Sequence, residues 1–256
     1  MGWMRNRRRQ RLRATALPAE WRRIVSRNVP YYQCLPPDRQ LELEGLIQVF
    51  LAEKSFEGAG GLRVTDEIRL TIAAEACILL LGREPRFYPD LDVVIVYPGA
   101  YVSRMARRGP DGTVDDGPQV RLGESWKQGA MVLSWDDVVR GARDIHDGHN
   151  VVLHEFAHQL DSQHGLADGS PPLETRSMYV AWARVLGREY EDLVERLRRH
   201  APTFLDAYAA TSPAEFFAVA TEFFFEKPRA MLARHPELYE QLKTFYGQHP
   251  AVWRCP

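Results

Sequence analysis

The sequence contains no hydrophobic run long enough to span a bilayer, and its start lacks the apolar region of an export signal. Arginines crowd the segment from Arg5 to Arg13, but neither an apolar stretch nor a cleavage-like site follows them. The sequence also has no excess of one charge sign, because its 33 Lys and Arg residues nearly balance its 34 Asp and Glu residues and leave a formal net charge of -1. We therefore expect no membrane span, no export, and no direct binding of nucleic acid.

Cysteine is scarce. The chain has only Cys34, Cys77 and Cys255, and none of them has a second cysteine at metal-ligand spacing. Three scattered cysteines are typical of free thiols in a reducing compartment. Together with the missing export signal, they predict a cytoplasmic protein.

The length and composition are those of an ordinary globular protein. The chain has 256 residues, of which 45% are hydrophobic and 26% charged, and this is enough for an ample core. We find no internal repeat and no second domain boundary. Residues 1–16 are expected to be a basic, solvated tail, because no apolar periodicity ties them to a core. Residues 17–256 are expected to form a single domain.

Apolar residues recur at helical spacing in most of the chain, and β-branched runs are few and short. We expect a mobile connection over 104–118, where glycine, proline and aspartate gather. The fold class predicted is α+β, mainly helical with a small mixed sheet. Helices are predicted from about 36 to the break at 58–61, and near 65–80, 150–161, 175–199, 213–227 and 228–245, and strands near 91–97, 120–122 and 130–135.

One stretch has the pattern of a catalytic metal site. His154, Glu155 and His158 form H-E-x-x-H in a segment that is otherwise apolar. Residues four apart lie on one face of a helix, so the two imidazoles can bind one metal ion. Glu155 lies about 100° around the helix from His154, where it can hold a water without ligating the metal. An amphipathic surface helix with inert histidines is the alternative.

A third protein ligand would leave zinc one open position, as catalysis requires, and the spacing offers two candidates. His164 lies ten residues after His154, at a known spacing that needs glycine at position 161, where this chain has Asp161. Glu215 shares a helix face with Glu222, seven residues later, in an apolar segment. It also fits a helix cap, because Ser212 and Pro213 precede it. Spacing alone leaves both candidates open.

Longer stretches resemble the Mlc titration factor A family of bacterial zinc peptidases. The resemblance runs from about Leu17 to Tyr246, and the arginine-rich start departs from the family pattern. It rests on Gly123–Gly129, Val132–Trp135, Asn150–Asp161, Asp206–Ala210 and Pro213–Ala218. The resemblance implies a zincin-like fold, similar to the catalytic domain of anthrax lethal factor.

The resemblance also implies roles for single residues. His154, His158 and Glu215 would bind one zinc ion, Glu155 would be the general base, and Tyr208 would stabilise the transition state with its hydroxyl. His164 is not part of the family pattern. Asp161 and Glu222 are candidates for orienting the ligand histidines. A core tyrosine is the alternative for Tyr208.

The family's members have aminopeptidase activity and, in enterobacteria, bind a glucose-responsive repressor. The expected function is therefore hydrolysis of peptides, with a zinc-activated water and Glu155 as base. The alternative is a regulatory protein that sequesters a transcriptional repressor, for which hydrolysis is secondary. A full set of base, ligands and oxyanion donor would be superfluous for sequestration, which favours the enzyme.

Overall fold

The computed structural model describes residues 2–84, 86–99, 101–103, 107–108, 114–115, 119–121, 123–126 and 129–255. The side chains of the residues described between 101 and 126, and that of His164, are outside this description. The connection predicted over 104–118 falls mostly outside the described residues. The α-helices are α1 (Gly2–Ala14), α2 (Ala19–Asn28), α3 (Tyr31–Cys34), α4 (Pro37–Glu53), α5 (Asp66–Ile78), α6 (Trp135–Arg143), α7 (Val151–Asp161), α8 (Arg176–Arg198), α9 (Pro213–Glu226), α10 (Pro228–Arg234) and α11 (Pro236–Tyr246). Three short 3₁₀ helices are η1 (Ser162–His164), η2 (Ala207–Ala210) and η3 (Pro250–Val252).

The main sheet has the strand order β1-β2-β8-β7. Its strands are β1 (Ser55–Gly58), β2 (Val93–Tyr97), β7 (Gly123–Trp126) and β8 (Ala130–Ser134). The first three in that order are parallel, with Ser55 opposite Val93 and Val93 opposite Ala130. Strand β7 pairs antiparallel with β8 and lies at the edge. The predicted α+β class with a small mixed sheet is confirmed.

Four shorter strands form two antiparallel pairs. Strands β3 (Tyr101–Ser103) and β6 (Gln119–Arg121) pair with each other, as do β4 (Arg107–Arg108) and β5 (Val114–Asp115). Among the described residues, no helix is both long and apolar enough to cross a membrane.

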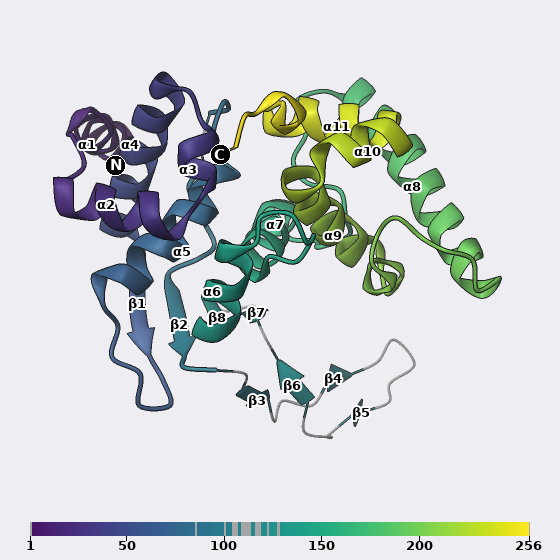
Figure 1. Ribbon diagram of the computed structural model, residues 1–256, viewed down its shortest axis with the longest axis horizontal. Helices are drawn as coiled ribbons and strands as arrows, with labels where there is room; N and C mark the ends of the chain where they lie inside the picture. Colours follow the sequence, from purple (N-terminus) through teal and green to yellow (C-terminus); the bar gives the residue numbers. More distant parts are fainter. Residues whose placement is uncertain are drawn as a thin grey trace.

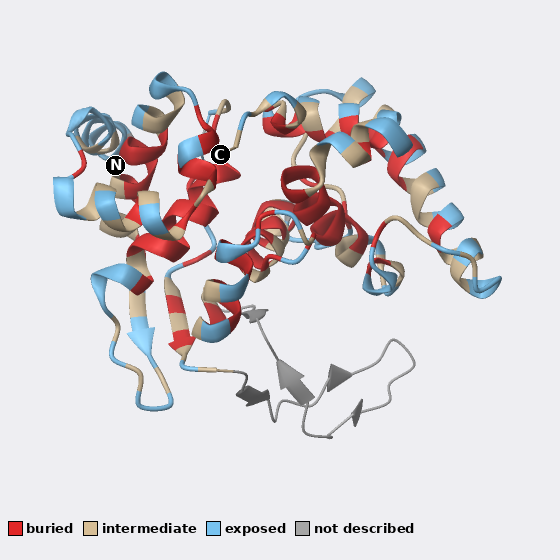
Figure 2. Ribbon diagram, in the orientation of Figure 1, coloured by how far each residue is buried: buried red, intermediate tan, exposed pale blue. Residues whose placement is uncertain are grey.

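Helix α7 lies in the middle of the molecule, between α5 and α6 on one side and α9 on the other (Figure 1). Figure 2 shows that α7 and α9 are largely buried, whereas α1 is largely exposed and α8 has buried, intermediate and exposed residues along its length. Every residue of α9 from Phe216 to Glu226 is buried. This explains why its phenylalanines surround the helix instead of forming one stripe.

Side chains fix where these two helices begin. The Asn150 side chain accepts hydrogen bonds from the N–H groups of Val152 and Leu153 at the start of α7. The Ser212 hydroxyl accepts one from Glu215 at the start of α9. Caps of this kind satisfy N–H groups that have no partner within the helix. The predicted cap at Ser212 is therefore present, and it does not prevent the Glu215 side chain from reaching α7.

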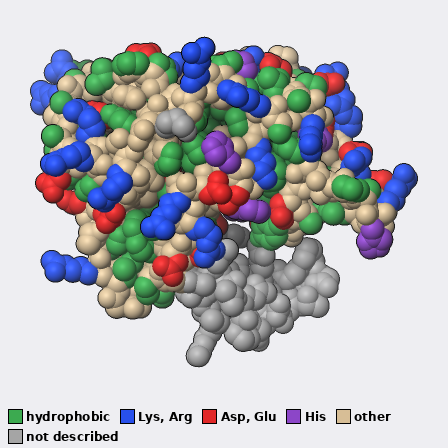
Figure 3. All heavy atoms as spheres, viewed as in Figure 1, with side chains coloured by type: hydrophobic (Ala, Val, Ile, Leu, Met, Phe, Trp, Pro, Cys, Tyr) green, Lys and Arg blue, Asp and Glu red, His purple; other side chains and the backbone are tan. Residues whose placement is uncertain are grey.

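The arginine-rich start is helix α1 in the structure, which differs from the solvated tail that the sequence predicts. Both nitrogens Nε and Nη2 of Arg9 lie 2.7 Å from the carboxylate of Glu53 on α4. The backbone of Arg13 passes so close to Gly45 that a β-carbon there would lie 2.8 Å from its carbonyl oxygen. Figure 3 shows Lys and Arg side chains spread over the end of the surface where α1 and α2 lie. Helix α1 is held to α4 by an ion pair and by a close approach of the two backbones. These contacts do not require apolar residues at helical spacing, and the sequence of α1 has none.

Cys34 and Cys255 form a disulfide, with their Cα atoms 4.3 Å apart and a separation of 221 positions in sequence. The prediction of three free thiols is wrong for these two, and only Cys77 remains a free, buried thiol. The pairing arises because the C-terminal segment folds back over α3, where Trp253 packs edge-on against Tyr31. The spacing of cysteines along the sequence cannot reveal a contact between opposite ends of the chain. The cysteines therefore no longer support a reducing compartment.

Candidate metal centre

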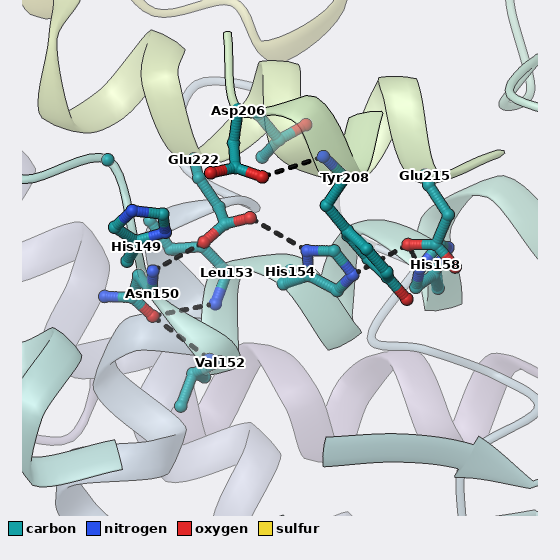
Figure 4. A network of polar contacts seen from close by, with 12 residues as sticks. His149, Asn150, Val152, Leu153, His154, His158, Asp206, Tyr208, Glu215 and Glu222 are labelled. Atoms are coloured by element: carbon teal, nitrogen blue, oxygen red, sulfur yellow. Dashed lines mark hydrogen bonds and ion pairs between the residues drawn. The ribbon is translucent and has the colours of Figure 1, made fainter. Parts of the chain in front are cut away.

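The structure brings three of the predicted metal-site residues together. Suitable donor atoms of His154, His158 and Glu215 all lie within 4.8 Å of one another. The two histidines are one turn apart on α7, and Glu215 reaches them from the first turn of α9 (Figure 4). The Nε2 atoms of His154 and His158 lie 3.0 and 3.3 Å from the same carboxylate oxygen of Glu215. The two imidazoles and this carboxylate thus face one point.

These distances fit zinc. Tetrahedral zinc holds nitrogen and oxygen ligands at about 2.0–2.2 Å, which places the ligand atoms about 3.3–3.6 Å from each other, slightly farther apart than the Nε2 and carboxylate atoms here. His164 follows α7 directly as the last residue of η1, but the position of its side chain is outside the described residues. The geometry therefore supports Glu215 as the third ligand and leaves the His164 alternative without a test.

The electrostatics of the site favour a positive charge at its centre. Burial lowers the pKa of His154, but hydrogen bonds to Glu215 and Glu222 raise it by more, so that it lies well above the ordinary value of 6.5. Burial raises the pKa of Glu215, whereas hydrogen bonds with His154 and His158 lower it by more. A protonated imidazole would supply the positive charge that these carboxylates favour. A metal cation bound at the same point would supply it too.

Glu222 lies behind His154 on the side away from Glu215. Its Oε1 lies 2.8 Å from Nδ1 of His154, and its Oε2 accepts a hydrogen bond of 2.6 Å from the Asn150 N–H. Figure 4 shows this carboxylate between Asn150 and His154. With a metal bound at Nε2, the remaining hydrogen of His154 would be on Nδ1 and would donate to Glu222, because a carboxylate accepts and does not donate. The predicted orienting contact of Glu222 is therefore present.

Asp161, the other residue considered for orienting a ligand, has a different contact. Its Oδ2 accepts a hydrogen bond of 2.8 Å from the N–H of Gly169. Gly169 has a positive φ of 82°, and a β-carbon there would lie 2.4 Å from the carbonyl oxygen of Pro213. Asp161 thus holds a loop against the start of α9, close to Glu215.

Glu155 and Tyr208 lie beside the three converging residues. Glu155 is buried on α7, and its charge contributes to the raised pKa of His154. The Tyr208 ring centre is 6.0 Å from that of His154, and the side chain is 52% exposed. Figure 4 shows its hydroxyl on the side of the site where His158 and Glu215 lie. The exposure excludes the alternative of a core tyrosine.

Sequence reasoning missed two buried carboxyl groups close to this site. Glu75 on α5 accepts a hydrogen bond from the Asn150 side chain, and Glu226 on α9 accepts from the N–H groups of Gly148 and His149. An acidic residue in the apolar run Ile72–Ile78 was the available signal for Glu75. Glu226 follows Glu222 by one helical turn, which places both on one face of α9.

Comparison with known proteins agrees with such a site. Residues 3–247 match the family described as glucose-regulated metallo-peptidase M90, and the chain belongs to this family of metallopeptidases. The match includes most of the arginine-rich start, which the sequence pattern alone places outside the family.

Individual relatives support the same family assignment. The chain is 32% identical over 235 residues to Mlc titration factor A of Serratia proteamaculans, covering 91% of this chain and 88% of that protein. It is 33% identical over 229 residues to Mlc titration factor A of Escherichia fergusonii, covering 88% and 84%. A protein of Synechocystis described as uncharacterized is 42% identical over 238 residues, covering 92% and 86%. The resemblance to the Mlc titration factor A family is confirmed.

Proposed function

We propose that this protein is a zinc-dependent peptidase with a zincin-like catalytic fold. The convergence of His154, His158 and Glu215 from α7 and α9 carries the proposal. Glu155 beside the two histidines, and Tyr208 across from them, supply the remaining groups that hydrolysis of an amide needs. The family to which the chain belongs supports the same chemistry.

His154, His158 and Glu215 would hold the zinc ion, which when bound supplies a Lewis acid that polarises the scissile carbonyl and lowers the pKa of water. Glu155 takes a proton from the attacking water and delivers it to the leaving nitrogen as the C–N bond breaks. The Tyr208 hydroxyl donates a hydrogen bond to the carbonyl oxygen as negative charge develops there. Glu222 keeps the His154 imidazole oriented during both steps.

The substrate of this reaction is a peptide, and we propose cleavage of the aminopeptidase type from the family resemblance. Strand β7 lies at the edge of the sheet and next to α7, and no strand in the described part of the chain pairs with its outer side, so this edge suits an extended peptide. Aminoacyl reporter substrates with free and with acetylated amino groups distinguish an aminopeptidase from an endopeptidase. An aminopeptidase hydrolyses the free form and leaves the acetylated form intact.

Metal analysis and hydrolysis by the purified protein test the proposal. We expect about one zinc per chain and turnover that a chelator abolishes. Glu155→Gln should keep the zinc and lose turnover, because the base is not a ligand. Replacement of His154 and His158 by alanine should remove the zinc. Full zinc content in that double variant, or parental turnover in Glu155→Gln, would reject the mechanism.

The names of the relatives support a second candidate function. Proteins called Mlc titration factor A cover most of the chain, and we propose that a transcriptional repressor is a second partner. A cytoplasmic location, which this partner requires, is part of the proposal, although the cysteines no longer support it. Glu155→Gln separates the two functions. If it still binds the repressor in size-exclusion chromatography, binding does not need hydrolysis.

A further inference from the structure

Glu75 is a carboxyl group in an apolar position. It lies in the middle of α5 among Ile72, Ala73, Ala74 and Ala76, and it is 0% exposed. Burial raises its pKa from 4.5 to about 8, while the hydrogen bond from Asn150 lowers it. Burying such a group costs free energy that a hydrophobic residue of the same size would not cost. The position therefore calls for a reason other than core packing.

Asn150 supplies the contact that Glu75 makes. The Nδ2 atom of Asn150 donates a hydrogen bond of 2.7 Å to Oε1 of Glu75. The other half of the same amide, Oδ1, accepts from the N–H groups of Val152 and Leu153 at 3.1 and 3.0 Å. A rotated amide would turn Nδ2 towards those N–H groups and lose the cap. The oxygen Oε1 of Glu75 accepts from Nδ2 and so favours the orientation of Asn150 that starts α7.

Asn150 is also connected to His154 by two routes, one through its backbone oxygen and one through its backbone N–H. The backbone oxygen of Asn150 accepts the first hydrogen bond of α7, from the His154 N–H at 2.9 Å. The backbone N–H of Asn150 donates to Glu222, whose second oxygen contacts Nδ1 of His154. Both the backbone and the imidazole of His154 are therefore fixed through Asn150.

We propose that Glu75 is a positioning residue for the metal centre, acting on His154 through Asn150 and Glu222. The chain of contacts joins three helices, from α5 through the start of α7 to α9 and back to the imidazole. Glu75 touches neither the metal-binding atoms nor the substrate. This inference rests on the proposed zinc site and adds to it a residue outside the H-E-x-x-H and Glu215 motifs.

The test compares two replacements of Glu75 by zinc affinity, measured in competition with a chelator. Glu75→Leu leaves the Asn150 amide without its acceptor, and we expect zinc to bind about ten-fold more weakly. Glu75→Gln retains a carbonyl acceptor and should restore the parental affinity. In the zinc-loaded protein, the nuclear magnetic resonance signal of the His154 Nδ1 hydrogen should broaden or shift in Glu75→Leu and not in Glu75→Gln.

Glu44→Leu is the matched control for loss of stability. Glu44 is a buried carboxyl group on α4, paired with Arg22 and Tyr32 and outside this chain of contacts. We expect it to lower the melting temperature and leave zinc affinity unchanged. If Glu75→Leu behaves in the same way, with parental affinity and an unchanged His154 signal, Glu75 is only structural and the inference is wrong.

Asn150→Ser carries the test if Glu75→Leu does not fold. Serine is a good helix cap but is too short to reach Glu75, so it should weaken zinc binding as well. Parental affinity in this variant would overturn the inference. The parent protein is measured first, since failure of the parent to bind zinc overturns the proposed function together with this inference. Zinc binding by the parent with no effect in the variants overturns the inference alone.

Discussion

At the scale of single residues, Glu215 is the side chain on which the architecture of the site depends. It comes from a different helix than the histidines, and both of their Nε2 atoms face the same oxygen of its carboxylate. Glu215→Ala should therefore weaken zinc binding strongly while keeping the Ser212 cap, which uses the backbone N–H of residue 215. His164→Ala should bind zinc and turn over substrate like the parent.

Zinc analysis of these two variants decides between the two candidate ligands that spacing leaves open. If the His164 variant loses the metal and the Glu215 variant keeps it, the ligand assignment is wrong. The chain would then close its site just after α7, and α9 would serve only as support.

Tyr208 offers a test of the mechanism that leaves the metal untouched. Its ring lies beside His154, and the side chain is largely exposed, so removal of the hydroxyl should not disturb the core. Tyr208→Phe should keep zinc and melting temperature while lowering kcat with little change in KM. The reason is that the hydroxyl acts on charge that exists only in the transition state. Steady-state kinetics with unchanged kcat would remove Tyr208 from the mechanism.

Glu226 links a single residue to the pH dependence of stability. Burial, followed by the nearby charges of Asp147 and Glu222, raises its pKa from 4.5 to about 9. Between these two values the folded protein keeps a proton that the unfolded chain has lost. The contribution of Glu226 to stability is therefore greatest below about pH 4.5 and falls as the pH rises towards 9.

Glu226→Gln removes this titration while keeping an acceptor for the N–H groups of Gly148 and His149. The melting temperature of the variant relative to the parent should rise between about pH 5 and about pH 8. Thermal unfolding of both proteins across this range checks the sign. A difference that stays constant with pH would show that Glu226 is ionised in the folded protein.

At the scale of helices and strands, the longer apolar patterns predict their elements, whereas the short amphipathic helices α2 and α6 were not predicted. Helices α4, α5, α7, α8 and α9 and strands β2 and β8 lie where hydrophobic spacing places them. Helix α6 was missed because its nine residues follow β8 without a break, although they are amphipathic and Ser134 caps the helix at Asp137. The pairing of α7 with α9, which brings Glu215 to the histidines, came from family resemblance, because spacing along one helix says nothing about its neighbour.

Helix α1 gives the element-scale prediction. It is held to α4 by the Arg9–Glu53 ion pair and by the close approach to Gly45, so deletion of residues 1–16 should lower the melting temperature by several degrees. Zinc content should not change, since α1 packs mainly against α4, away from α7 and α9 (Figure 1). Arg9→Ala should reproduce part of the loss, whereas Arg11→Ala, at an exposed position, should not. An unchanged melting temperature after deletion would support the prediction that residues 17–256 form a domain without the tail.

At the scale of the whole molecule, the disulfide joins the first helices to the end of the chain. Figure 1 shows the C-terminus next to α3, and the bond between Cys34 and Cys255 closes a loop of 221 residues in sequence. A covalent link over such a distance restricts the unfolded chain more than a short loop does. It stabilises the folded molecule as a unit and does not act on the metal site directly.

Counting the reactive thiols tests this bond. The denatured, unreduced protein should react with one equivalent of a thiol reagent, from Cys77, and three equivalents would restore the original expectation of free cysteines. Cys34→Ser should lower the free energy of unfolding by about 2–5 kcal/mol, and a reducing agent should lower the melting temperature of the parent to the same level. The reducing agent should then have no further effect on Cys34→Ser. Because the variant lacks only the covalent link, an equal melting temperature for the reduced parent and the variant assigns the whole effect to the bond between the two ends of the chain.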